Sequence, residues 1–130
     1  MREFQPEKLI AVHQAADEVY DLLQDYSGMR LDEILGQRWC HAIAPLLSTA
    51  LHSRRVENKP ISGLGDASIN FHMFLDLGEG WYADAAWQQF REVPSLLLPK
   101  VLVFDRKNAA TVLATHGVDR SNHKFWLSVI

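Results

Sequence analysis

The spacing of apolar and polar residues divides the chain into a helical part followed by a strand-rich part. From Pro6 to Tyr26, apolar residues recur every three or four positions, which is the spacing of one helix face. The residues of this face are Leu9, Val12, His13, Ala16, Val19, Tyr20 and Leu23. The same pattern predicts a short helical turn over Leu31–Leu35, ended by Gly36 in the left-handed conformation, and a helix over Cys40–His52 that contains Pro45.

Beyond the helices, the period of the pattern changes from 3.6 to 2. The polar composition of Arg54–Asp66 predicts an exposed loop. Apolar and polar residues then alternate over Ser68–Leu77, which predicts a strand with one buried face. Gly78–Gly80 predicts a tight turn, and Trp81–Trp87 predicts the returning strand of a β-hairpin.

The last third of the chain carries shorter signals. Val101–Phe104 and Phe125–Ile130 are expected to be strands, with a helix between them over Asn108–His116. Asn108 is expected to cap that helix and Gly117 to end it. The length of 130 residues fits one domain, 1–130, and the order of elements predicts an α+β fold with N-terminal helices packed on a small antiparallel β-sheet.

Composition and charge exclude several function classes. The 48% hydrophobic and 22% charged residues are typical of a globular domain, and a net charge of -3 gives no basic field for nucleic acid. No apolar run approaches the roughly 18 residues of a membrane span, and the first residues show no signal peptide. We therefore expect a cytoplasmic protein with no membrane or nucleic-acid partner, and delivery into another cell as an effector stays open.

A single cysteine limits the chemistry further. Cys40 excludes an internal disulfide and an all-cysteine metal site. A zinc site built from Cys40, His41, His52 and His72 is disfavoured, because no two of them have a recognised ligand spacing. We expect no metal and no cofactor.

The most informative residues are Cys40, His72 and Asp84. Cys40 stands at the start of a predicted helix, and a helix N-terminus lowers the pKa of a thiol by favouring the thiolate. His72 lies on the polar face of the predicted strand, and Asp84 on the paired strand is expected to face it. An imidazole beside a thiolate acts as general acid and base, and a carboxylate fixes its tautomer.

A family resemblance supports this interpretation. The segment Gly80-Trp81-Tyr82-Ala83-Asp84-Ala85-Ala86-Trp87-Gln88-Gln89-Phe90 resembles the W-x-x-D-x-T-x-x-Q-F segment of papain-like and transglutaminase-like cysteine enzymes, among them bacterial papain-fold toxins and effector-type glutamine deamidases. The stretch from Asn70 to Leu77 resembles their histidine strand, and Trp39-Cys40-His41-Ala42 occupies the place of their cysteine helix. The resemblance implies a papain-like fold and a Cys40–His72–Asp84 triad that acts on amides through a thioester.

Two further residues are candidates for supporting roles, and one position departs from the family pattern. Gln37, three residues before Cys40, is the candidate donor of an oxyanion hole, and Asn70 shares the face of His72. Ala86 stands where the family segment usually has Thr, which removes a hydroxyl beside the carboxylate.

Each candidate also has a structural interpretation. In the structural interpretation, Cys40 is a small buried apolar residue, His72 is a strand histidine whose hydrogen bonds are satisfied, and Asp84 is a charge at the edge of a strand. The expected function is a cysteine-dependent amide hydrolase or acyltransferase acting on a protein or peptide, of the glutamine deamidase or peptidase type, with water or an amine as acceptor. The alternative is a catalytically inactive protein-binding domain of papain-like fold, and Asp76 and His41 remain secondary candidates for the carboxylate and the base.

Overall fold

The helical first part of the chain precedes an antiparallel sheet, and the fold is α+β, as predicted. The structure is a computed structural model that describes residues 3–64 and 71–130. Its elements are α1 (Pro6–Ser27), α2 (Leu31–Leu35), α3 (Cys40–Ser53), β1 (Lys59–Leu64), β2 (Phe71–Gly78), β3 (Trp81–Asp84), the 3₁₀ helix η1 (Trp87–Phe90), β4 (Leu102–Asp105), α4 (Ala109–Thr115), the 3₁₀ helix η2 (Arg120–Asn122) and α5 (Lys124–Leu127).

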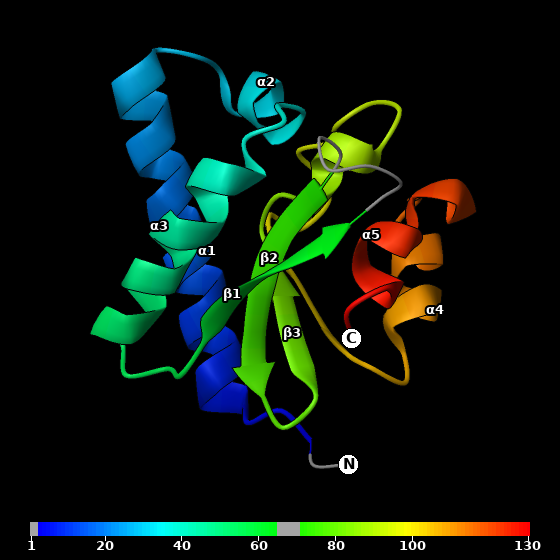
Figure 1. The fold of residues 1–130 in the computed structure, drawn as a ribbon. Coiled ribbons are helices and arrows are strands. Elements are labelled where there is room, and N and C mark those ends of the chain that lie inside the picture. Colours follow the sequence, from blue (N-terminus) through cyan, green and yellow to red (C-terminus); the bar gives the residue numbers. More distant parts are fainter. Residues whose placement is uncertain (1–2, 65–70) are drawn as a thin grey trace.

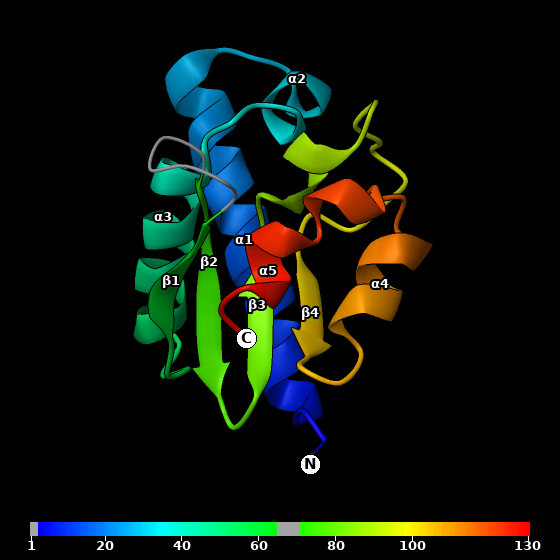
Figure 2. The same ribbon diagram turned by 45° about the vertical axis from the view of Figure 1, so that its right-hand side comes forward.

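The described elements form three layers (Figures 1 and 2). The sheet has the strand order β1-β2-β3-β4, and each strand is antiparallel to its neighbour. The N-terminal helices cover one face of this sheet, while α4 and α5 cover the other. Each face therefore has its own hydrophobic cluster, one built mainly with α1 and α3 and one built around the aromatic residues that α4 and α5 cover.

The N-terminal helices pack on the sheet as the sequence predicts. Pro6 is the first residue of α1, and Gly28 follows the helix at a φ of 70°, in the left-handed region that glycine adopts without strain. The buried face is centred on Val12, Ala16 and Val19, while His13 is exposed. Helix α3 begins at Cys40 and continues through Pro45 to Ser53, so the proline does not end it.

The hairpin is confirmed, but its second strand is shorter than predicted. β2 and β3 pair around the turn at Gly78 and Gly80, whereas β3 ends at Asp84 and not at Trp87. Oδ1 of Asp84 accepts a hydrogen bond from the backbone N–H of Ala86 at 2.8 Å, and an aspartate bonded two residues ahead turns the chain. The chain then enters η1.

The prediction of an exposed loop over Arg54–Asp66 is wrong for part of that segment. Residues Lys59–Leu64 form β1, which pairs with β2 in a register that places Pro60 opposite Leu75 and Gly63 opposite His72. The polar composition concealed a strand at the edge of the sheet, where proline is tolerated because one side needs no ladder hydrogen bond.

The prediction of a strand over Phe125–Ile130 is also wrong, because residues 124–127 form α5. Trp126 is fully buried against the sheet, and a Cβ atom at Gly63 would lie only 1.5 Å from the carbonyl oxygen of Phe125. The missing side chain at Gly63 lets the backbone of α5 approach β1 closely. Tertiary packing thus overrides the strand propensity of the segment.

The remaining predictions are mostly confirmed. Helix α2 matches Leu31–Leu35, but Gly36 has a right-handed backbone (φ -89°, ψ -1°) because the single turn ends with a hydrogen bond from the Gln37 N–H to the Ile34 carbonyl. Helix α4 begins after Asn108, whose side chain makes no capping bond, and Gly117 follows it at a φ of 79°. The predicted strand residues 68–70 lie outside the described residues.

The polar face predicted for β2 is not a solvent face. His72 and Phe74 point to the same side of the strand and are 0% and 1% exposed, because α5 covers that side. Over residues 3–64 and 71–130, no helix combines the length and apolar character that a bilayer crossing requires.

The close approach at Gly63 predicts that Gly63→Ala detaches α5. We expect a loss of about 2 kcal/mol or more in the free energy of unfolding, because the clash is with backbone that cannot rotate away. This loss is measured by urea unfolding, with tryptophan fluorescence as the signal.

Gly36→Ala is the matched control for this substitution. Its Cβ would lie 3.2 Å from a ring carbon of Pro94, an approach to a side chain that is tight by only a few tenths of an ångström, so we expect a change within about 1 kcal/mol. Equal stability of the two variants would contradict the proposed role of Gly63.

Candidate active site

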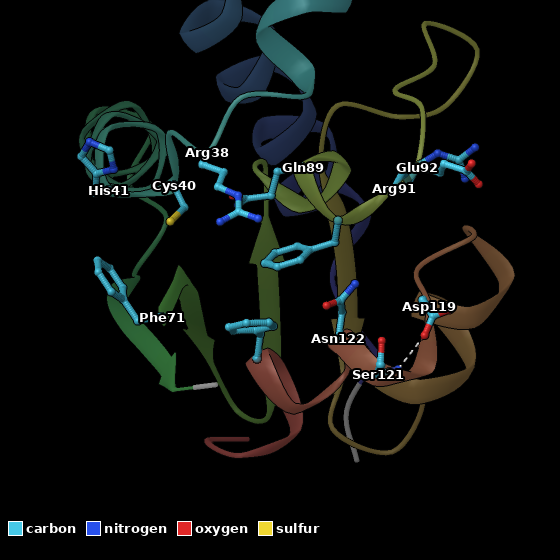
Figure 3. A pocket seen from close by; sticks show the side chains of 12 residues that line it. Arg38, Cys40, His41, Phe71, Gln89, Arg91, Glu92, Asp119, Ser121 and Asn122 are labelled. Atoms are coloured by element: carbon cyan, nitrogen blue, oxygen red, sulfur yellow. Dashed lines mark hydrogen bonds between the residues drawn. The ribbon is translucent and has the colours of Figure 1, made fainter. Parts of the chain in front are cut away.

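Cys40 is the first residue of α3. Trp39 precedes it in a non-helical conformation and makes no side-chain capping bond, so the first amides of the helix are uncapped by that residue. Cys40 is 5% exposed and lies in the wall of a cavity of about 640 Å³. The sulfur points into the cavity in Figure 3, whereas the side chain of the neighbouring His41 points away from it.

His72 is supplied by β2 and lies behind the cavity wall, fully buried. Aromatic rings surround the imidazole: Phe74 is stacked at 5.8 Å between ring centroids, and Phe90 and Trp126 meet it edge-on at 4.8 and 5.0 Å. This packing fixes the plane of the ring. It also removes water from both nitrogens, so each must find its partner within the protein.

Asp84, the last residue of β3, is 1% exposed and is fully occupied by donors. Its Oδ2 accepts from Nε2 of His72 and, at 2.6 Å, from the indole N–H of Trp126, while Oδ1 accepts from the backbone of Ala86. The buried carboxylate is stabilised by these three bonds and by the charge that His72 carries when protonated. Asp84 thereby fixes His72 on one side and anchors α5 on the other.

Two shifted pKa values show how the groups act on each other. Burial favours the neutral imidazole, yet the charge and hydrogen bond of Asp84, with a further contribution from Cys40, raise the pKa of His72 from 6.5 to about 9. Burial opposes ionisation of Cys40 as well, but hydrogen bonds with His72 and with the backbone of Met73 lower the pKa of the thiol below its ordinary value. Both shifts favour a thiolate beside an imidazolium.

Tyr20, from α1, supports the turn of the chain that follows Asp84. Its hydroxyl donates a hydrogen bond to the carbonyl of Ala85, the residue after Asp84. Burial, and then the charge of Asp84, raise the pKa of Tyr20, so its hydroxyl keeps its proton and remains a donor.

Gln89 is a site residue to which the sequence interpretation assigned no role. Its amide nitrogen lies 3.1 Å from Nδ1 of His72 and 3.0 Å from the carbonyl oxygen of Ala86. Gln89 occupies the glutamine position of the family segment, which is the signal that points to it. The adjacent Gln88 is structural, since its amide bonds to the backbone of Ser95 and Pro99.

The structure brings together Cys40, His72 and Asp84, but not every predicted supporting residue. Gln37 does not line the cavity, and Asn70 lies outside the described residues. Asp76 binds the backbone N–H of Gly78 at the hairpin turn. Among the described residues, no group of three or more His, Cys, Asp and Glu side chains is placed to hold a metal ion.

The cavity in front of Cys40 has aromatic and charged walls (Figure 3). Cys40 and Arg38 lie on one side and Ser121 and Asn122, from η2, on the other. The aromatic lining residues are Phe71, Phe90 and Phe125. The guanidinium of Arg91 is held by the carbonyls of Val93 and His116.

Comparison with known proteins gives no relative: no family model, curated protein or solved structure matches the chain. The function of the chain is therefore inferred from the geometry of the site and from the resemblance of the segment around Asp84.

The link between Asp84 and His72 predicts the effect of Asp84→Asn on the imidazole. With the negative charge removed and the ring still buried, we expect the pKa of His72 to fall from about 9 towards or below 6.5. An NMR titration of the histidine side chains measures this.

Asp76→Asn removes a carboxylate from the same strand without touching His72, and it should leave that pKa near 9. An unchanged titration of His72 in Asp84→Asn would show that the carboxylate does not control the imidazole.

Proposed function

We propose that the chain is a cysteine-dependent amide hydrolase or acyltransferase of papain-like type, acting on a protein or peptide. The observation that carries this proposal is a buried imidazole bonded to a carboxylate through Nε2 and interacting with the cavity-lining thiol of Cys40. A purely structural histidine needs no hydrogen bond with a thiol. A purely structural cysteine needs no opening to a cavity.

The chemistry follows from these contacts. Cys40 passes its proton to His72, and the thiolate attacks the carbonyl carbon of the substrate amide. As the tetrahedral intermediate collapses, His72 returns the proton to the leaving nitrogen, and a thioester with Cys40 remains. Water or an amine then attacks the thioester, its proton passing to His72, and Cys40 is released with its proton restored.

The negative charge that develops on the carbonyl oxygen of the substrate needs positive partial charge beside Cys40. Backbone N–H groups at the start of α3 provide this positive partial charge, because Trp39 does not cap them with its side chain.

The absence of Thr at position 86 is compensated, since the backbone N–H of Ala86 and the indole of Trp126 donate hydrogen bonds to Asp84 in place of a hydroxyl. This compensation favours an enzyme over an inactive domain with a decayed site.

The resemblance of the segment from Trp81 to Phe90 favours a glutamine side chain as the substrate amide. Protein-bound glutamine carries a primary carboxamide, and the cavity of about 640 Å³ has room for such a side chain with part of its backbone. Aromatic walls suit the methylene groups of the side chain.

Cys40→Ala should abolish the amide chemistry while leaving the fold intact. The substitution removes one sulfur atom, so we expect a stability loss of about 1 kcal/mol or less. Mass spectrometry of protein substrates for a 1 Da deamidation or a peptide cleavage is the assay, with thermal unfolding as the control. A loss of several kcal/mol would favour the buried-hydrophobe interpretation of Cys40.

The pairing of Cys40 with His72 predicts the pH dependence of thiol alkylation. In the wild-type protein, iodoacetamide should react well below the ordinary thiol pKa, because protonated His72 stabilises the thiolate. Turnover should decline as the pH rises through about 9, where His72 loses its proton.

His72→Gln and His72→Ala should move the alkylation curve upward, towards that of an ordinary thiol near ~8.5. Circular dichroism establishes which of the two variants keeps its fold. Curves that superimpose on the wild type in a folded variant would rule out the catalytic pair and leave the protein-binding alternative.

A further inference from the structure

Gln89 presents a hydrogen-bond donor to His72, and its orientation is fixed by a second contact. One amide atom of Gln89 lies 3.0 Å from the carbonyl oxygen of Ala86 and 3.1 Å from Nδ1 of His72. A carbonyl oxygen only accepts, so the amide atom that faces it is the NH₂ group. The same NH₂ group faces Nδ1, so this contact favours the form of the ring in which Nδ1 is an acceptor without a proton.

The other ring nitrogen, Nε2, is not free to bond with Cys40. Nε2 donates to the carboxylate of Asp84, so the thiol of Cys40 has only Nδ1 available. Gln89 and Cys40 thus compete for a hydrogen bond with the same atom, Nδ1 of His72. Once the thiol proton moves to Nδ1, this nitrogen becomes a donor and faces the NH₂ group of Gln89, which is an unfavourable contact between two donors.

We propose that Gln89 is a positioning residue that restrains the catalytic pair: its amide stabilises the neutral Nε2–H imidazole relative to the protonated ring and must leave Nδ1 when the thiolate–imidazolium pair forms. The inference rests on the proposed function. Gln89 also lines the cavity, so a carbonyl oxygen that enters can accept the N–H that Gln89 otherwise gives to His72. Occupation of the cavity is then coupled to formation of the thiolate.

No other described group around His72 supplies the same control. The side chains against the imidazole are Asp84 from β3, Cys40 from α3, Phe90 and Gln89 from η1, Trp126 from α5 and Phe74 from β2 itself. Asp84 and the thiolate of Cys40 are the charged groups of this set, and both favour the protonated ring. Gln89 is the member whose hydrogen bond favours the neutral ring.

The test replaces the amide with a side chain of similar length that has no donor, Gln89→Met. Removing a hydrogen bond to the neutral imidazole should make iodoacetamide alkylation about threefold to tenfold faster at pH values below the wild-type midpoint, and it should lower that midpoint by about half to one pH unit. The ¹⁵N resonance of Nδ1 in His72 should show a larger protonated fraction at pH 7. A merely structural role would produce neither change.

Asn122→Ala is the matched control, because Asn122 lines the same cavity without a contact to His72. It should leave both the alkylation midpoint and the Nδ1 resonance at their wild-type values. An unchanged midpoint in a folded Gln89→Met protein, or a midpoint that rises, overturns the inference.

The failure of this inference is distinguishable from that of the proposed function. If His72→Gln shifts the alkylation curve but Gln89→Met does not, the catalytic pair stands and the restraint by Gln89 is wrong. If neither variant shifts the curve, Cys40 and His72 do not form a pair and both ideas are wrong.

Discussion

The buried carboxylate of Asp84 is the constraint on which the rest of the structure depends. A negative charge that is 1% exposed is tolerated only when donors surround it, and this fold supplies them from three separate segments: the imidazole of His72, the indole of Trp126 and the backbone of Ala86. The second strand of the hairpin stops at this residue, the chain turns on its Oδ1, and α5 is anchored by its Oδ2. Fold and site are therefore joined at one side chain.

The same side chain explains why the sheet needs a hydrophobic layer on both faces. With only the N-terminal helices in place, His72 and Asp84 would face water, and the field between them would be weak. The small residue Gly63 allows α5 to lie directly on β1, and Trp126 then covers the ion pair. Exclusion of water strengthens the effect of Asp84 on the imidazole enough to overcome the cost of burying the ring.

Much of the fold could be predicted because local periodicity carries it. The apolar spacing in α1, the glycine-rich turn of the hairpin and the cysteine at the start of α3 depend on neighbouring residues alone. Strand β1 and helix α5 could not be predicted, since each is defined by what it packs against: the contact of Gly63 with Phe125 is invisible in either segment alone. The polar composition of β1 predicted a loop, and the apolar residues of α5 predicted a strand.

The site likewise has a part that the sequence predicts and a part that depends on contacts between distant segments. Cys40, His72 and Asp84 were recognisable as candidates from residue type and order, and the structure places them side by side. The interpretation missed that His72 is buried and not on a polar face, because the covering layer comes from a distant part of the chain. Gln89 was overlooked for a related reason: its contact with Nδ1 depends on how η1 turns after Asp84.

The late position of α5 in the chain has a consequence for biosynthesis. Synthesis proceeds from the N-terminus, so Cys40, His72 and Asp84 all emerge before the indole of Trp126 that packs on His72 and Asp84. Contacts over such long sequence separations also form slowly. Until α5 docks, the imidazole is hydrated and gives the thiol little activation. Under the proposed function, a growing chain therefore carries an ordinary cysteine, and the activated thiolate forms only once the polypeptide has folded.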